Sequence, residues 1–149
     1  MIGYLGAVRV KKLVEDAKLP EYANKMSDSG ADVFSVDRYE IQPGERVIVH
    51  TGIALTIPDG FECQVRSKSG LAFNKGLAVL NSPGTVDNGY RGEVGVILIN
   101  HSNQTQIIEY GDKVAQLVIV PVQQAFFIED QNMNMDTARG EGGFGSTGK

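Results

Sequence analysis

Residues 81–93 bring a carboxylate and an aromatic ring together in a polar segment that is rich in turn-forming residues. The segment separates two apolar runs, and its Pro83-Gly84 and Asn88-Gly89 pairs each predict a bend. We therefore expect Asp87 and Tyr90 to be held at defined positions on a stiff loop, as candidate functional groups. The alternative is a decorated β-hairpin in which Asp87 only caps the turn.

A second candidate segment, residues 139–149, contains five glycines, two hydroxyl side chains and two cations. Gly143–Lys149 matches the start of a phosphate-binding loop, but that motif also requires a preceding strand, a following Ser or Thr and a helix, so we do not assign it. The glycines, Arg139 and Lys149 are suited to fold over a polyanion, and Phe144 has little to pack on except a flat ligand. The alternative is a disordered tail.

The composition excludes several classes of protein. A net charge of −4 argues against broad binding of nucleic acid, which normally needs a basic surface. Cys63, His50 and His101 are too few for a Cys/His zinc cluster, and the lone cysteine has no partner for an internal disulfide. No apolar run approaches the roughly 20 residues of a membrane span, and the N-terminus lacks the charge order of a signal peptide. We expect a cytoplasmic protein without membrane or stable nucleic-acid partners.

Short apolar runs with period-two patterning position these candidate groups. The runs are rich in Val and Ile and are separated by turns that contain Gly, Pro and Asn, which is typical of an all-β sandwich or barrel. The expected strands cover residues 47–49, 53–57, 62–66, 77–80, 94–99, 114–120 and 125–128.

Only two segments have helical character, and both are short. One is Leu13–Lys18, and the other is Ser69–Asn74, where Ser69 is a candidate N-cap. We predict one β domain over residues 1–130 and a flexible, Gly-rich tail over residues 131–149.

Five ordered motifs complete the sequence evidence. They are Ser29–Asp32, Lys68–Ala72, Asn81–Glu93, Gly111–Leu117 and Arg139–Gly148, and Leu19–Ala23 precedes them. In this order the motifs resemble those of the trimeric deoxyuridine triphosphate nucleotidohydrolases, the dUTPases, over essentially the whole chain. The resemblance implies a jelly-roll β-barrel, a homotrimer, and Mg²⁺-dependent hydrolysis of dUTP to dUMP and pyrophosphate. That reaction keeps uracil out of DNA and supplies dUMP for thymidylate synthesis.

The resemblance also implies roles for individual residues around the phosphates. Asp87 would activate the attacking water, and Asp32 would contact a magnesium ion through water, in keeping with the tendency of Mg²⁺ to retain its hydration shell. The phosphate ligands would be Lys68, Ser69, Gly70 and Gln116. For Gln116 the alternative is a solvent-facing polar residue on a strand.

Selection of the base and sugar is implied for the 81–95 segment. Its backbone around Asn81, Thr85, Val86 and Gly95 would pair with the edge of uracil, and Tyr90 would lie against the deoxyribose, where a 2′-hydroxyl would clash. For Tyr90 the alternative is an ordinary cross-strand aromatic. The tail would then close over the nucleotide through Arg139, Phe144, Gly145 and Ser146.

Two lysines depart from the family pattern. Lys68 and Lys113 stand where arginine is usual, and an ammonium group lacks the planar fork with which a guanidinium binds phosphate or carboxylate. Arg66 lies two residues before Lys68 and is expected to point to the same face, so it is a candidate to compensate.

Two other functions remain open at this point. Deoxycytidine triphosphate deaminases share the fold, and a nucleotide-binding regulatory protein would keep the site while acting through a protein partner. The intact Asp87 segment and the Phe-Gly tail favour dUTP hydrolysis.

Overall fold

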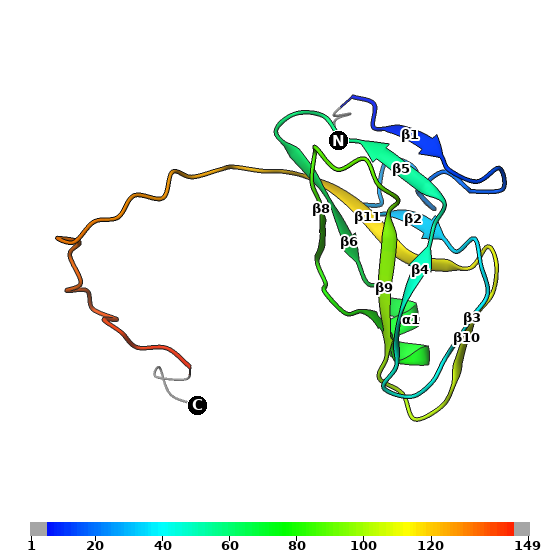
Figure 1. Cartoon of the computed structure of the whole chain (residues 1–149). Helices are drawn as coiled ribbons and strands as arrows, with labels where there is room; N and C mark the ends of the chain where they lie inside the picture. Colours follow the sequence, from blue (N-terminus) through cyan, green and yellow to red (C-terminus); the bar gives the residue numbers. More distant parts are fainter. Residues whose placement is uncertain (1–5, 145–149) are drawn as a thin grey trace.

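The computed structural model describes residues 6–144, and this part of the chain is mostly β (Figure 1). The strands are β1 Arg9–Lys12, β2 Ala31–Phe34, β3 Tyr39–Ile41, β4 Arg46–His50, β5 Ile53–Thr56, β6 Phe61–Arg66, β7 Leu77–Val79, β8 Gly84–Val86, β9 Gly95–Asn100, β10 Gln106–Ile108 and β11 Lys113–Pro121. The helix is α1, Ser69–Lys75. The prediction of an all-β fold with at most one short helix is confirmed.

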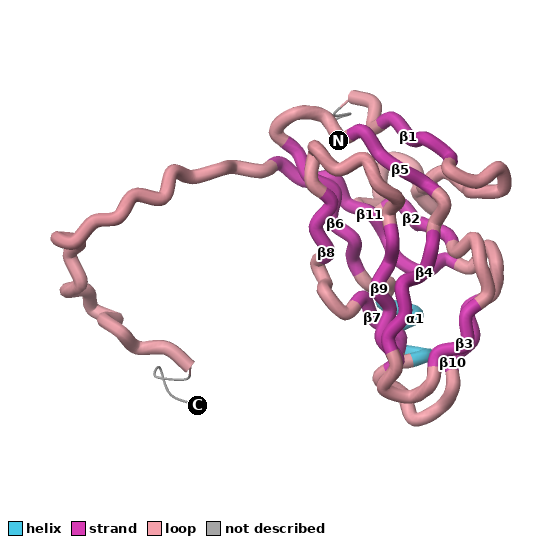
Figure 2. The backbone as a smooth tube through the Cα atoms, viewed as in Figure 1, coloured by secondary structure: helices cyan, strands magenta, loops and turns pink. Residues whose placement is uncertain are grey.

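The strands form small antiparallel sheets around a single core (Figure 2). One sheet has the order β2-β11-β6-β8 and another the order β4-β9-β7, while β1 pairs with β5 and β3 with β10. Inward-facing aliphatic side chains from these sheets fill the core, and the largest of them are fully buried: Ile41, Ile53, Leu77, Leu98 and Ile108. Strict alternation of residue types predicted β6, in which Cys63 and Val65 are buried, whereas a Val- and Ile-rich run predicted β9, in which Val96 and Leu98 are buried.

Six of the seven expected strands are confirmed within one or two residues, whereas the seventh is wrong. Residues 125–128 form no strand, and their side chains project into solvent, with Phe126 97% and Phe127 98% exposed. These apolar side chains have no sheet of their own chain to pack against. Residues 122–144 instead form an extended arm, which is still bonded to the barrel at Val122, through Gly60 O, and then runs away from it (Figure 1). The proposed boundary at residue 130 stays a prediction.

One of the two expected helices is confirmed. Leu13–Lys18 is a turn, not a helix, because Leu13 N–H bonds to Gly52 O and ties the segment to the β4–β5 connection. Helix α1 is present, but its N-cap is Lys68, without a side-chain capping bond, so Ser69 is the first helical residue. The helix ends at Gly76, whose φ of 65° and contact with Ser102 leave no room for a side chain.

Residues 81–93 are more than a hairpin turn. Strands β7 and β9 do pair with each other, but residues 84–86 between them form β8, which pairs with β6 in the other sheet. The segment thus crosses from one sheet to the next before it reaches Asp87. This crossing fixes both ends of the Asp87 loop to the barrel.

Among the described residues, no helix is long and apolar enough to cross a membrane.

Candidate active site

A buried carboxylate and two lysines form the first part of the site. Asp32 on β2 is 5% exposed, and its Oδ1 and Oδ2 accept hydrogen bonds from Nζ of Lys68 and Nζ of Lys113, the latter at 2.8 Å. Burial by itself would raise the pKa of Asp32, but the bonds from Lys113 and Lys68 outweigh it and hold the pKa below its ordinary value. The same bond raises the pKa of Lys113. The cluster keeps a net charge of +1, which suits an anion.

Gln116 connects this cluster to the start of α1. It lies on β11 opposite Asp32, and its Nε2 donates to Ser67 O at 3.0 Å. Its side chain also rests on Gly30, where a Cβ would overlap Gln116 Oε1. Gln116 therefore positions the turn that carries Ser69 and Gly70, which are both exposed. The structure thus brings together every residue that the resemblance placed near the phosphates apart from Asp87 and the tail.

Arg66 and Lys68 lie on different elements and make different contacts. Strand β6 ends at Arg66, and Lys68 follows the strand as the N-cap of α1, so the expected alternation of side chains stops before Lys68. The guanidinium of Arg66 instead donates to Gln64 Oε1 from Nε at 3.0 Å and from Nη2 at 2.6 Å. The expected same-face alignment of Arg66 and Lys68 is therefore absent, and compensation for the Lys68 substitution by Arg66 stays a prediction.

The second part of the site is the loop around Asp87, which directly follows β8. A bond from Tyr90 N–H to Asp87 O at 3.0 Å closes the turn. Asn88 Nδ2 donates to Ile57 O at 2.5 Å and to Asp59 at 3.3 Å, which ties the loop to the β5–β6 connection. Sequence reasoning assigned Asn88 only to a bend and missed this anchoring role, which the Asn-Gly pattern does not reveal.

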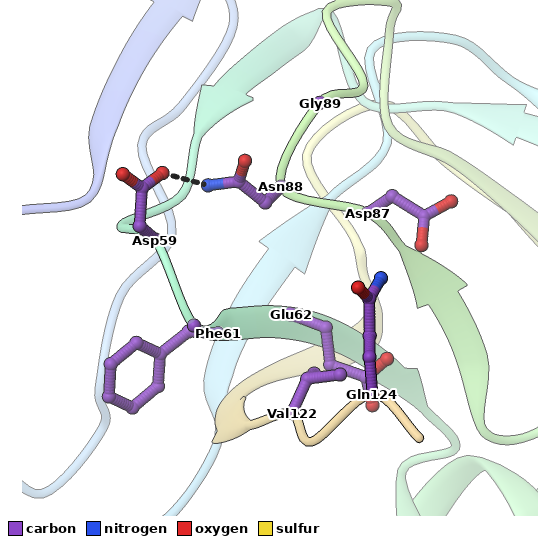
Figure 3. A pocket seen from close by; sticks show the side chains of 9 residues that line it. Asp59, Phe61, Glu62, Asp87, Asn88, Gly89, Val122 and Gln124 are labelled. Atoms are coloured by element: carbon purple, nitrogen blue, oxygen red, sulfur yellow. Dashed lines mark hydrogen bonds between the residues drawn. The ribbon is translucent and has the colours of Figure 1, made fainter. Parts of the chain in front are cut away.

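The Asp87 loop borders a cavity of about 520 Å³ (Figure 3). Its other walls come from the start of β6 and from Val122 and Gln124. Figure 3 shows that Asn88 points toward Asp59, whereas Asp87 points to the opposite side of the loop. Within residues 6–144 the Asp87 carboxylate has no hydrogen bond or ion pair, so its oxygens are available to a water or a ligand.

The residues expected to select base and sugar surround the same loop. Asn81 lies beside Gly84, where a Cβ would come within 3.3 Å of its amide. On β8, Thr85 is exposed and Val86 is buried. Tyr90 is half-exposed, and its hydroxyl donates to Glu93 O at 3.0 Å. Gly95 begins β9, where a Cβ would meet Ile48.

The two parts of the site lie far apart within one chain. Asp32 is opposite Gln116 on β11, which is opposite Arg66 on β6, while Val86 pairs with Cys63. Strands are about 4.8 Å apart and rise about 3.3 Å per residue, so this register places Asp87 roughly 15–20 Å from Asp32. A single chain therefore does not bring the Asp87 loop onto the lysine cluster.

Two of the expected tail residues, Arg139 and Phe144, lie in the described chain, and neither contacts either part of the site. Arg139 Nε donates to Gly142 O within the arm at 2.8 Å, and Phe144 is fully exposed. Gly145 and Ser146 lie outside the described residues. Figure 1 shows the arm leaving the barrel after β11 and then bending round in a wide arc that stays clear of the barrel in this view.

Comparisons with known proteins agree with these features. A family model described as dUTPase matches residues 15–148. The deoxyuridine 5′-triphosphate nucleotidohydrolase of Hydrogenobaculum sp. (strain Y04AAS1) is 55% identical over 140 residues, which are 93% of this chain and 96% of the relative. The enzyme of Clostridium tetani is 49% identical over 142 residues, which are 95% of this chain and 97% of the relative.

Solved structures show the same fold. A mutant dUTPase of Staphylococcus bacteriophage 80alpha with dUpNHpp superposes with a TM-score of 0.85 at 28% identity, covering 96% of this chain and 99% of that one. The structure of a mutant dUTPase from phage phi11 of S. aureus, which reveals the coordination of a structural Mg(II) ion, gives a TM-score of 0.79 at 27% identity. It covers 86% of this chain and 99% of that one. By its sequence over nearly its full length and by its fold, the chain belongs to the dUTPase family, the deoxyuridine triphosphate nucleotidohydrolases.

Proposed function

We propose that this dUTPase hydrolyses dUTP to dUMP and pyrophosphate at a site shared between copies of the chain in a homotrimer. The observation that supports the sharing is the separation of roughly 15–20 Å between Asp87 and Asp32. Both groups are assigned to one triphosphate, so the Asp87 loop of one copy faces the Asp32–Lys68–Lys113 cluster of a neighbour. Closed homo-oligomers make such shared sites geometrically natural.

Asp87 is the proposed catalytic residue. Hydrolysis at a phosphate requires an oriented water and neutralisation of the phosphate oxygens, with little covalent work by the protein. The exposed Asp87 carboxylate accepts a hydrogen bond from the attacking water and takes up its proton as the water adds to phosphorus. The anchored loop supports this role, because its bonds to Ile57 O and Asp87 O hold the carboxylate in place.

Lys68 and Lys113 are the proposed electrostatic part of the site. With one carboxylate between them, the pair presents a net positive charge, and Ser69, Gly70 and Gln116 line the same edge. When the triphosphate binds, at least one lysine turns from Asp32 toward phosphate oxygens. Lysine binds phosphate as a point charge, so it neutralises without fixing the orientation of the group.

The residues present fit Mg²⁺ only as a companion of the triphosphate. Within residues 6–144, no three His, Cys, Asp or Glu side chains are grouped to hold a metal ion, so there is no protein cage. Mg²⁺ keeps several waters and is commonly held by one or two carboxylates and by substrate phosphates. Asp32 offers one buried carboxylate for such an outer contact. When bound, the ion would supply further neutralisation of the phosphate charge.

Selection of dUTP is proposed for the 81–95 segment. Its backbone near Asn81, Thr85 to Val86 and Gly95 pairs with the uracil edge, and a base with other donors and acceptors leaves buried groups unpaired, which costs up to ~10⁴-fold or more. Tyr90 lies against the deoxyribose and leaves no room for a 2′-hydroxyl.

The arm is proposed to close the site of another copy. Residues 122–144 reach far enough to do so, because an extended chain spans about 3.3 Å per residue. The exposed Phe144 stacks on uracil, while Arg139, Gly145 and Ser146 cover the phosphates. Closure excludes bulk water from the reacting phosphate.

A cytoplasmic location is proposed on the basis of Cys63. Burial raises the pKa of this thiol to about 12, so it stays protonated and packed in the core. A lone, buried and inert thiol agrees with a reducing compartment.

A product analysis tests the function. The protein is incubated with each deoxynucleoside triphosphate and Mg²⁺, and the products are identified. We expect dUMP and pyrophosphate from dUTP alone. Ammonia release from dCTP would indicate a deaminase, and no turnover of any nucleotide would indicate a protein that acts only through a partner.

A further inference from the structure

Glu93 joins the end of the substrate loop to the turn between β4 and β5. Its Oε1 accepts the Gly52 N–H at 2.7 Å, and its Oε2 lies 2.8 Å from Nδ1 of His50. His50 ends β4 and Gly52 lies in the turn that follows, so the carboxylate makes a two-point contact across 41 and 43 residues of sequence. Neither the proposed chemistry nor the motif comparison gives this side chain a task.

The turn that receives Glu93 is rigid. Gly52 has a φ of 66°, and a Cβ there would lie 2.6 Å from Val14 and 3.0 Å from Ala17, so packed side chains hold this backbone from the other side. Next to it, the buried Thr51 hydroxyl donates to Val94 O at 2.5 Å. A group fixed to this turn is therefore fixed to the core.

Tyr90 is held by the same residue and by its neighbour. The Tyr90 hydroxyl donates to the backbone carbonyl of Glu93 at 3.0 Å. The ring also lies across Gly92, where a Cβ would be only 2.5 Å from Cζ of the ring. The position of the ring thus depends on the Glu93 carbonyl, which the two contacts of the Glu93 side chain hold in place, and on the absence of a side chain at Gly92.

We propose that Glu93 is a positioning residue which, together with the bare backbone of Gly92, sets the place of the Tyr90 ring and so decides how well a deoxyribose is distinguished from a ribose. The inference rests on the proposed contact of Tyr90 with the sugar. Glu93 touches no part of the substrate and acts through Tyr90. A ring that moves by a fraction of its own thickness makes room for a 2′-hydroxyl.

The test measures kcat/KM for dUTP and for UTP in the full-length protein. Glu93→Ala removes both contacts, and we expect the ratio of dUTP to UTP to fall about tenfold, the effect of one lost hydrogen bond of ordinary strength. Glu93→Gln keeps an oxygen for the Gly52 N–H and should retain a ratio close to that of the wild type. Adding Glu93→Ala to Tyr90→Ala should lower the ratio no further than Tyr90→Ala alone.

Glu45→Ala is the matched control. The Glu45 carboxylate also accepts a backbone N–H, that of Gln42 at 2.8 Å, but on an exposed turn away from the loop. Its loss should leave the ratio unchanged. A fall in this control equal to that of Glu93→Ala would overturn the inference, because it would show a general effect on the fold.

The outcomes separate this inference from the proposed function. An unchanged ratio in Glu93→Ala beside a lowered ratio in Tyr90→Ala would overturn the role of Glu93 and leave that of Tyr90 standing. An unchanged ratio in Tyr90→Ala would overturn both. If Glu93→Ala does not fold, Gly92→Ala decides: its φ is not left-handed, so alanine fits the backbone, yet its Cβ displaces the ring. An unchanged ratio there would contradict the inference.

Discussion

The Asp32 cluster and the Asp87 loop solve the same problem, the placement of a carboxylate, in opposite ways. Asp32 is buried, and two ammonium groups satisfy its oxygens. Asp87 is exposed, its carboxylate oxygens have no partner within residues 6–144, and contacts made by its neighbours, among them Asn88 and Glu93, hold the loop that carries it. In the first arrangement, lysines bonded to Asp32 are available to turn toward substrate phosphates. In the second, the Asp87 carboxylate is free to accept a hydrogen bond from the attacking water. The two carboxylates therefore differ in what their removal should cost.

The largest effect is expected at Asp87. Asp87→Asn should preserve the fold and dUTP binding but lower kcat about 10²-fold or more, because an amide cannot take the proton from the attacking water. Steady-state kinetics and a binding assay with a non-hydrolysable analogue measure the two quantities. Asp16→Asn, at another exposed carboxylate, is the control for the change of charge. Near-normal turnover in Asp87→Asn would remove Asp87 from the mechanism.

Mixing two inactive variants tests whether one site is built from several copies of the chain. A chain truncated after Asp136 should be nearly inactive, as Asp87→Asn should be. In an equal mixture refolded together, an intact loop comes only from the truncated chain and an intact arm only from the substituted chain. If loop and arm belong to different copies, roughly a quarter of the sites are complete when mixing is random.

Activity near that fraction, together with a mass that corresponds to hybrid trimers, would support sites built from several copies. Hybrid trimers without recovered activity would mean that the loop and the arm of one site come from the same chain.

The comparison of the two regions also shows what the sequence could predict. Alternation in β6 predicted a strand with one buried face, because burial of one face has a period that can be read from residue types, and a run of Val and Ile residues predicted β9. Phe126 and Phe127 carry the same apolar signal, but no face of this chain covers them, and residue types do not reveal whose surface they pack on. The Pro83-Gly84 and Asn88-Gly89 pairs revealed bends, but strand β8 in this segment pairs with a strand some twenty residues away.

For the site, as for the fold, the sequence predicted some features and not others. The motifs named Asp32, Lys68 and Gln116, and the fold brings these three together. The motifs did not indicate that both oxygens of Asp32 are bound by lysines or that Glu93 and Asn88 hold the substrate loop. Such contacts join residues 31 to 81 positions apart, and single-sequence patterns contain no information on pairs at that distance.

Substitutions of Lys68 test whether the Asp32–Lys68–Lys113 cluster acts through its charge. Lys68→Ala should raise KM or lower kcat by the equivalent of roughly 1.5–3 kcal/mol, the range for a hydrogen bond to a charged group. Lys68→Arg should be tolerated, since it keeps the charge and adds a planar fork. Measurement of kcat and KM with dUTP for both variants checks these expectations. Wild-type behaviour of Lys68→Ala would show that this ammonium group is not used by the substrate.

The smallest effect is expected from the charge of Asp32 on stability. Its pKa lies below the ordinary value in the folded chain because Lys113 and Lys68 outweigh burial, so the ionised form stabilises the fold above the unfolded pKa of about 3.9. That contribution is lost as the pH falls through the folded pKa. Asp32→Asn should therefore be less stable than the wild type by about 1–2 kcal/mol at pH 7, a modest loss because both lysines can return to water. Urea unfolding at pH 7, 5 and 3 should show this difference shrinking only below about pH 4, and a difference that stays constant down to pH 3 would mean that the ion pairs do not stabilise the barrel.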